Sequence, residues 1–274
     1  MKHSINFYYI TKAIEAEKAA ALLKASGITC LDYTPPVEME NWKAIMYDNI
    51  KIFEKYGLKV HQTHAPFNRY GTYGSEFAEL TKRALSASLE MGAQFMVVHG
   101  DEFDFEKESY SPEKALSYNY ELFAPIVEAA EKKGLNIAFE NVFEDGLPQK
   151  RFCSEAEELK ELILKFNSRC VSCCWDFGHA HVAFKEKQAE KIEYMKNLIT
   201  CTHVHDNSHG TDLHLPPFYG EINWKDCMKA LKKSGYSGNL SFEFVYGAIP
   251  EAVAKTFLDS VYNTGEYLTE LFNN

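Results

Sequence analysis

Short apolar runs alternate with longer amphipathic stretches along the whole chain. Eight of the short runs have the length and the aliphatic, aromatic and β-branched content typical of buried strands. The predicted strands cover residues 6–10, 28–33, 58–64, 95–99, 136–140, 171–176, 199–203 and 239–244. Strands that alternate with helices in this way indicate successive βα units around a parallel sheet.

Eight amphipathic helices are predicted between and after these strands. The clearest carries apolar residues at alternating steps of three and four, which places them on one face: Phe77, Leu80, Ala84, Ala87 and Met91. A second such face lies in a helix that opens at Ser111-Pro112 and ends at Gly134. The other helices cover residues 13–26, 41–56, 155–166, 186–197, 224–234 and 250–272.

This succession predicts an α/β fold, a single closed (β/α)₈ TIM barrel that forms one domain over residues 1–274. The length agrees, because such barrels routinely run to about 250 residues as one domain. A doubly wound open sheet is the alternative, since it shows the same alternation of strands and helices.

Composition narrows the class of protein. Hydrophobic residues make up 46% and charged residues 25% of the chain, which is typical of a globular protein. The net charge of −10 disfavours broad binding to nucleic acid, although a local basic groove stays compatible with it. No basic start is followed by a long apolar run and no stretch approaches the roughly 20 apolar residues of a membrane helix, so we expect a cytoplasmic protein without membrane contact. The helix faces leave the oligomeric state open.

Seven cysteines are present, and three of them form the cluster Cys170, Cys173 and Cys174. A zinc site of this type needs a second C-x-x-C pair, which the sequence lacks. The cluster lies in the apolar run CVSCCW, so we predict small buried strand residues there.

Potential metal ligands crowd into residues 200–214, which contain His203, His205, Asp206, His209, Asp212 and His214. Imidazole nitrogen and carboxylate oxygen are preferred ligands of zinc and of harder divalent metals such as manganese. A polar surface loop with solvated histidines is the alternative for this stretch alone.

Six predicted strands end in a residue that can bind a metal or move a proton: His64, His99, Glu140, Asp176, His203 and Glu243. Each alone could be a hydrogen-bonded core histidine or a salt-bridged acid. The carboxyl ends of parallel barrel strands meet at one face, however, and active sites are built there. The shared position therefore favours a metal site.

Side-chain alternation predicts that these acids point into the barrel mouth. Glu243 shares a strand face with Ser241, and the bulky Phe242 and Phe244 occupy the opposite face. The same pattern turns Glu140 and Asp176 inward. Converging buried carboxylates need a partner, and a divalent cation is a natural one.

The loops after the strands add further candidates. His179 follows Asp176 by three residues, and Asp212 and His214 lie on one side of a short extended segment. Asp32 and Asn141 are placed to orient ligands or water. His181 and His209 have no independent argument as ligands.

These residues lie in motifs whose order resembles the xylose isomerase-like barrel superfamily. That superfamily includes sugar and sugar-phosphate isomerases and epimerases, together with endonuclease-IV-like apurinic-site nucleases. The matching motifs are THAPF (63–67), VVHG (97–100), FEN (139–141), WDFGHAH (175–181), HVHDN (203–207), DLHLP (212–216), EINW (221–224) and SFEF (241–244). They span most of the chain.

The resemblance implies a metal site at Glu140, Asp176, His203 and Glu243, in which Glu140 and Glu243 are the catalytic proton-transfer pair. The nuclease-like members hold further metals, whose ligands fall on His64, His99, His179, Asp212 and His214. The implied cofactor is a divalent metal, Zn²⁺ or Mn²⁺, with one to three ions per chain.

The first functional hypothesis is a sugar or sugar-phosphate isomerase or epimerase that transfers a proton between two glutamates through a metal-stabilised enediolate. Its partner is a small carbohydrate. Aromatic residues that could form the walls of the sugar pocket are Phe7, Tyr8, Phe67, Tyr70, Tyr73, Phe105 and Tyr246.

The alternative is an endonuclease-IV-like apurinic-site endonuclease or phosphodiesterase with a three-metal cluster. It needs cationic and wedge residues for bent DNA. The only candidates are Asn68-Arg69-Tyr70 and Lys150-Arg151, and the loops 101–111 and 144–146 are acidic. A scaffold without catalysis is disfavoured, because it needs no convergent carboxylates.

Overall fold

The structure, a computed structural model, describes residues 1–67, 75–105, 108–144, 146, 150–247 and 249–274. Eight parallel strands form one sheet in the order β10-β1-β2-β3-β4-β5-β6-β7. The strands are β1 His3–Asn6, β2 Cys30–Tyr33, β3 Lys59–His64, β4 Phe95–His99, β5 Asn136–Glu140, β6 Val171–Asp176, β7 Ile199–His203 and β10 Leu240–Phe242.

Backbone hydrogen bonds around Val204 link the last strands of the sheet. Val204 N donates to Ser241 O at 2.7 Å, and Glu243 N donates to Val204 O at 3.1 Å. Because β7 continues in this way to β10, the sheet curls into a barrel. The predicted TIM barrel is confirmed.

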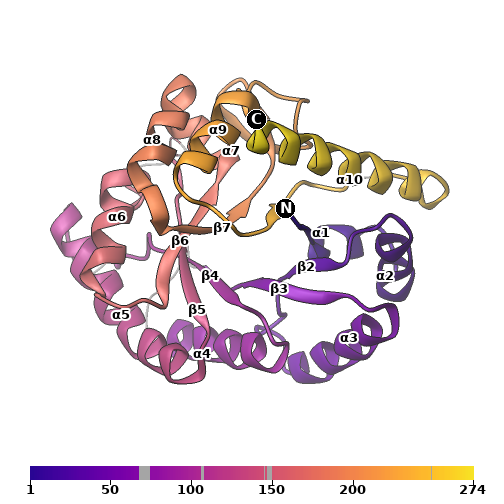
Figure 1. The fold of residues 1–274 in the computed structure, drawn as a ribbon. Coiled ribbons are helices and arrows are strands. Elements are labelled where there is room, and N and C mark those ends of the chain that lie inside the picture. The colour runs from indigo at the N-terminus through magenta and orange to yellow at the C-terminus, as the bar shows by residue number, and fades with distance from the viewer. Residues whose placement is uncertain (68–74, 106–107, 145, 147–149, 248) are drawn as a thin grey trace.

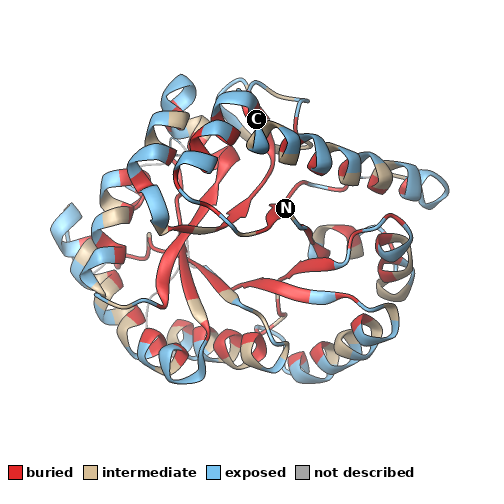
Figure 2. Cartoon of the chain, in the orientation of Figure 1, coloured by how far each residue is buried: buried red, intermediate tan, exposed pale blue. Residues whose placement is uncertain are grey.

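The helices form a ring around the strands (Figure 1). They are α1 Phe7–Thr11, α2 Ala16–Ala25, α3 Trp42–Tyr56, α4 Ser75–Glu90, α5 Pro112–Lys133, α6 Ala156–Lys165, α7 Phe177–Phe184, α8 Gln188–Met195, α9 Trp224–Lys233 and α10 Glu251–Asn273. Their inner faces are buried and their outer faces are exposed (Figure 2). No helix of the described residues is long and apolar enough to cross a membrane.

The core has two layers that follow the alternation of strand side chains. Phe139, Trp175 and Phe242 point outward into the large core between strands and helices. Val97, Ala138, Cys174 and Cys201 form a small cluster inside the barrel. All seven cysteines are buried and free, as predicted for the cluster at residues 170–174.

The first predicted strand, residues 6–10, is wrong. The strand ends at Asn6, and residues Phe7–Thr11 form α1. The Asn6 side chain accepts a hydrogen bond from Tyr9 N at 3.3 Å, which caps the helix start, and Phe7 and Ile10 then bury one helical face. The apolar run FYYI thus has helical spacing.

Two further elements escaped the prediction. Asp176 accepts from His179 N at 2.6 Å and caps α7, which replaces the expected loop. Strands β8 Asp206–Ser208 and β9 Thr211–Leu215 form an antiparallel hairpin across His209-Gly210. Both turn residues have positive φ, 56° and 66°, as a tight two-residue hairpin requires. The predicted helix 186–197 is confirmed only in its middle, as α8 between two 3₁₀ turns.

Candidate metal centre

Glu140 lies at the centre of the barrel mouth, at the end of β5, and is only 1% exposed. Its Oε2 is 3.1 Å from His64 Nε2 and 3.5 Å from His99 Nε2. Its Oε1 is 3.0 Å from His203 Nδ1 and 3.3 Å from His179 Nδ1. Side chains from β3, β4, β7 and α7 therefore converge on one buried carboxylate.

Among the described residues, three groups bring ligand atoms within 4.8 Å of one another. They are Glu140–Asp176–His203–Glu243, which we call the main cluster, His64–Glu140–His203, and His179–His205–Asp212–His214, which we call the second cluster. The predicted site residues thus come together, except that His99 belongs to none of these groups.

In the main cluster, one nitrogen of His203 faces both glutamates. Its Nδ1 lies 3.0 Å from Glu140 Oε1 and 3.2 Å from Glu243 Oε2. Asp176 Oδ2 is 3.8 Å from the same nitrogen. Three carboxylates, from the ends of β5 and β6 and from the residue after β10, therefore approach one small volume.

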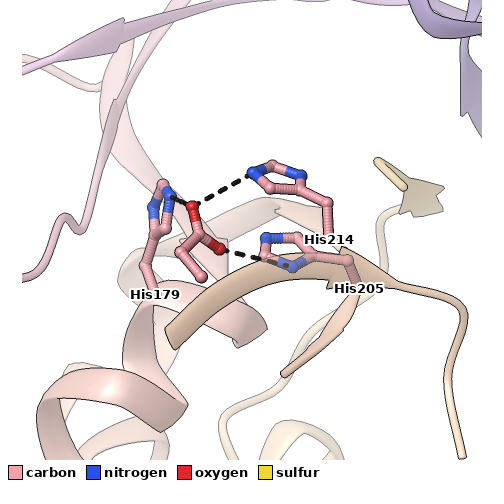
Figure 3. A group of neighbouring side chains, drawn as sticks. His179, His205 and His214 are labelled. Carbon is pink, nitrogen blue, oxygen red and sulfur yellow. Dashed lines mark ion pairs between the residues drawn. The ribbon is translucent and has the colours of Figure 1, made fainter. Parts of the chain in front are cut away.

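The second cluster is built around Asp212, whose carboxylate faces three imidazoles. Figure 3 shows the three rings, His179, His205 and His214, gathered around one place. Asp212 Oδ2 is 3.2 Å from His214 Nε2 and 3.6 Å from His179 Nε2. The rings of His205 and His214 stack with centroids 3.9 Å apart and planes 10° apart. The hairpin β8–β9 and helix α7 bring these residues together.

The acids and histidines at the barrel mouth shift one another's pKa values. Burial raises the pKa of Glu140, but the facing imidazoles of His203, His179 and His64 outweigh this effect and hold that pKa well below 4.5. For His214, burial lowers the pKa, but the hydrogen bond to Asp212 and the charge of Glu243 raise it to about 9. Positive charge is therefore favoured at this face.

The residues present fit a divalent cation. Carboxylates and imidazoles form the donor set that zinc and manganese accept. His205 Nδ1 is buried without a hydrogen-bond partner among the described residues, 3.9 Å from Asp212 Oδ1. A cation would satisfy this nitrogen.

Neighbouring residues hold the candidate ligands in place. Asp32 Oδ2 lies 3.1 Å from His203 Nε2 on the side away from the glutamates, and Gln62 Nε2 donates to Asp32 Oδ2 at 3.2 Å. Asn141 Oδ1 accepts from Asp176 N at 2.8 Å, and its backbone oxygen is 3.0 Å from His179 Nδ1. The predicted orienting positions of Asp32 and Asn141 agree with these contacts.

His205 is the residue that the sequence argument did not assign. It is fully buried, and its Nε2 lies 3.0 Å from Asp176 Oδ2. The signal was the spacing in HVH, since His203 and His205 share a strand face. Gly178 leaves room for the ring, because a Cβ at position 178 would lie 1.8 Å from His205 Cε1. His209 is exposed in the hairpin turn, and His181 lines a separate surface cavity.

A cleft of about 580 Å³ opens beside the main cluster and is lined by Asn6, Tyr8, Tyr9, Lys12, Pro35, Met39, His64, Phe67 and Glu243, among others. Of the predicted aromatic wall, Tyr8 and Phe67 line it. The prediction is wrong for Phe7 and Tyr246, because both side chains are 1% exposed and pack in the core. Phe105 also packs against the core, on Phe103. Tyr70 and Tyr73 lie outside the described residues.

The predicted DNA-binding cations are engaged elsewhere. Arg151 is 6% exposed and donates from Nε to Asp101 Oδ2 at 2.6 Å, and Lys150 Nζ lies 3.7 Å from Glu144 Oε1. Residues Asn68, Arg69 and Tyr70 lie outside the described residues.

Fold and site together define a (β/α)₈ barrel with a candidate metal centre at the carboxyl ends of its strands. The chain belongs to the xylose isomerase-like TIM barrel family, whose family model matches residues 17–262.

Comparisons with individual proteins agree with this family. The uncharacterized protein MJ1311 of Methanocaldococcus jannaschii is 28% identical over 205 residues, which cover 71% of this chain and 67% of that protein. A D-tagatose 3-epimerase-like protein superposes with a TM-score of 0.77 at 22% identity, over 97% of this chain and 99% of the other. The IolI protein with a bound zinc atom superposes with a TM-score of 0.75 at 18% identity, over 99% and 98%. These two structural similarities show the fold.

Proposed function

We propose that this protein is a divalent-metal-dependent isomerase or epimerase of a sugar or sugar phosphate. The observation that carries the proposal is the pair of glutamates, Glu140 and Glu243, whose carboxylates lie 3.0 and 3.2 Å from the same nitrogen of His203, with Glu243 lining an open cleft. The family includes such enzymes, and the similar structures include a D-tagatose 3-epimerase-like protein and the IolI protein with a bound zinc atom.

The proposed site residues divide the work. Glu140, Asp176, His203 and Glu243 would hold one cation, and His179, His205, Asp212 and His214 would hold another. A bound cation would supply Lewis-acid stabilisation of negative charge on substrate oxygens. One glutamate accepts the proton from the carbon next to the carbonyl, and the other returns a proton to the product carbon.

The protein environment suits this proton transfer. Glu140 begins as a carboxylate, because the surrounding imidazoles hold its pKa low. Glu243 lines the cleft, and Asn6 Nδ2 donates to its Oε1 at 3.3 Å, which orients the carboxylate. Residence in the cytoplasm and a single domain over residues 1–274 stay predictions.

A metal-dependent phosphodiesterase is the second candidate, because three groups of ligand atoms lie at the barrel mouth. Such an enzyme needs cations that face the phosphates of its substrate. The buried pairing of Arg151 with Asp101 removes one of the basic side chains available for that role, and the exposed Lys150 lies near the acid Glu144. The isomerase or epimerase is therefore preferred.

One paired assay tests the two functions. The protein is loaded with zinc or manganese, its metal content is measured, and it is incubated with D-fructose or D-tagatose in D₂O and, separately, with DNA that contains an abasic site. Deuterium on the sugar carbon, seen by NMR, supports the proposal. Three metals per chain with cleavage of the abasic DNA and no deuterium incorporation would overturn it. A chelated sample controls for background.

A further inference from the structure

Tyr9 lines the cleft, and the proposed proton transfer assigns no role to it. It lies on α1, directly after β1, and its backbone N donates to Asn6 Oδ1 at 3.3 Å. The same Asn6 donates from Nδ2 to Glu243 Oε1 at 3.3 Å. One asparagine therefore fixes both the turn that carries Tyr9 and the carboxylate of a proposed proton-transfer residue.

The Tyr9 side chain lies between the two clusters. Its ring packs against His214 of the second cluster, with centroids 5.9 Å apart and planes inclined by 50°. It lines the same cleft as His64 and Glu243 on the main-cluster side. A substrate that enters the cleft to reach Glu243 therefore passes Tyr9.

The Tyr9 hydroxyl is free among the described residues, none of which donates a hydrogen bond to it or accepts one from it. Other tyrosines of the barrel differ: the Tyr33 hydroxyl accepts from Asn49 Nδ2 at 2.8 Å, and the Tyr236 hydroxyl donates to Asn239 O. The Tyr9 hydroxyl, which lines the cleft, is therefore available to donate a hydrogen bond to a molecule that occupies the cleft.

We infer that the Tyr9 hydroxyl donates a hydrogen bond to an oxygen of the bound substrate, next to the carbon whose proton the glutamates transfer. The inference rests on the proposed isomerase or epimerase function. It describes the substrate as a hydroxy ketone or hydroxy aldehyde that presents an oxygen acceptor on the α1 side of the cleft.

A neutral hydrogen-bond donor suits this place because the barrel mouth is rich in negative charge. The mouth already holds the carboxylates of Glu140, Asp176, Asp212 and Glu243. A neutral phenol stays protonated near neutral pH, so it offers a donor to an oxygen that gains negative charge. Donors aimed at developing charge stabilise the transition state more than the ground state. Tyr9 keeps its proton, and no bond to it forms or breaks.

The test is Tyr9→Phe, which removes the hydroxyl and keeps the ring against His214. With zinc- or manganese-loaded protein and D-tagatose or D-fructose in D₂O, we expect kcat for deuterium incorporation to fall roughly 100-fold, with KM nearly unchanged. Metal content and melting temperature stay at the wild-type values, because the hydroxyl has no partner in the protein. Calorimetric binding of the ketose checks that the ground-state affinity is retained.

Tyr33→Phe is the matched control, since it removes a hydroxyl that does have a protein partner. It should lower the melting temperature by roughly 2–4 °C and leave kcat unchanged. Wild-type kcat in Tyr9→Phe overturns the inference while the proposed function stands. Absence of deuterium incorporation by the metal-loaded wild type overturns the proposed function, and the inference with it.

Discussion

Glu140 combines near-complete burial with a negative charge, which a protein interior tolerates only when the charge is compensated. Four imidazoles provide that compensation, and each comes from a different element. Removing any one partner would leave charge uncompensated in a buried place. This explains why ligands and their supports, such as Asp32 behind His203, form one connected network.

Glu243→Gln tests the proposed proton-transfer pair. The amide keeps the size of the side chain and an oxygen that can accept from Asn6 Nδ2, so the fold should be retained. It cannot accept a proton, and we expect deuterium incorporation into the ketose to fall about 100- to 10,000-fold. Circular dichroism and the melting temperature check the fold. A variant with wild-type turnover would show that Glu243 transfers no proton.

His61 provides a test of pH dependence away from the metal centre. It lies near the start of β3 and lines a cavity with Lys2 and Asn239. Burial lowers the pKa of His61 from 6.5 to about 4, Asp32 opposes this effect, and Lys2 adds to it. The unfolded chain therefore binds the proton first as the pH falls.

Stability from neutral His61 is complete above about pH 6.5 and is lost as the pH falls through about 4. The loss amounts to about 3 kcal/mol. His61→Gln removes this contribution, so its free energy of unfolding should fall less steeply between these pH values than that of the wild type. Urea titrations at both pH values measure the difference, and parallel curves would contradict the assignment.

Short elements at the strand ends position much of the site. Asn6 caps α1 and also contacts Glu243, and Asp176 caps α7 and also belongs to the main cluster. The helix starts are therefore built from the same residues as the site. A substitution at either residue would change local structure and site chemistry together.

The hairpin β8–β9 depends on Asp206, which is fully buried. Its carboxylate accepts from Phe218 N, Ile222 N and Trp224 Nε1 at 2.8, 3.1 and 2.9 Å. Asp206→Ala leaves these donors without a partner, and we expect a loss of at least about 3 kcal/mol in the free energy of unfolding.

The same variant should weaken metal binding at the second cluster, because β9 carries Asp212 and His214. Urea unfolding and metal titration measure the two effects. Asp226→Ala is the control: it removes an exposed carboxylate from α9 and should cost about 0.5 kcal/mol or less. If both variants lost the same free energy of unfolding and the same metal affinity, Asp206 would have no specific role in the hairpin.

The assembled barrel brings ligands from residues 64 to 243 to one face, which the unfolded chain cannot do. A cation that binds the folded state therefore stabilises it through mass action. At a concentration of 100 times Kd, zinc or manganese should add about 2.7 kcal/mol. For a chain of this size, the melting temperature should rise by roughly 5–10 °C above that of the chelated protein.

Differential scanning fluorimetry with and without chelator measures this shift. Glu140→Gln removes the charge shared by two of the ligand groups, so this variant should lose the part of the melting-temperature shift that the main cluster contributes. A wild-type melting temperature that does not respond to either metal would contradict a metal centre in this barrel.

Local sequence patterns predicted most of the barrel and most of the main cluster. The period-two alternation around Glu140, Asp176 and Glu243 depends only on strand geometry, so it predicted which side chains face the mouth. The parallel arrangement then requires the strand ends to meet, which brought His64 and His203 to the same place. These features follow from neighbours along the chain.

Contacts between loops distant in sequence were decided by packing. The apolar run after Asn6 became α1, and Tyr9 came to lie in the cleft, because Phe7 and Ile10 bury against the core. His205 joined the second cluster because Gly178 leaves space for its ring. Arg151 turned inward to Asp101, 50 residues away in sequence. No periodicity encodes such contacts, since they depend on the space that the closed barrel leaves for each loop.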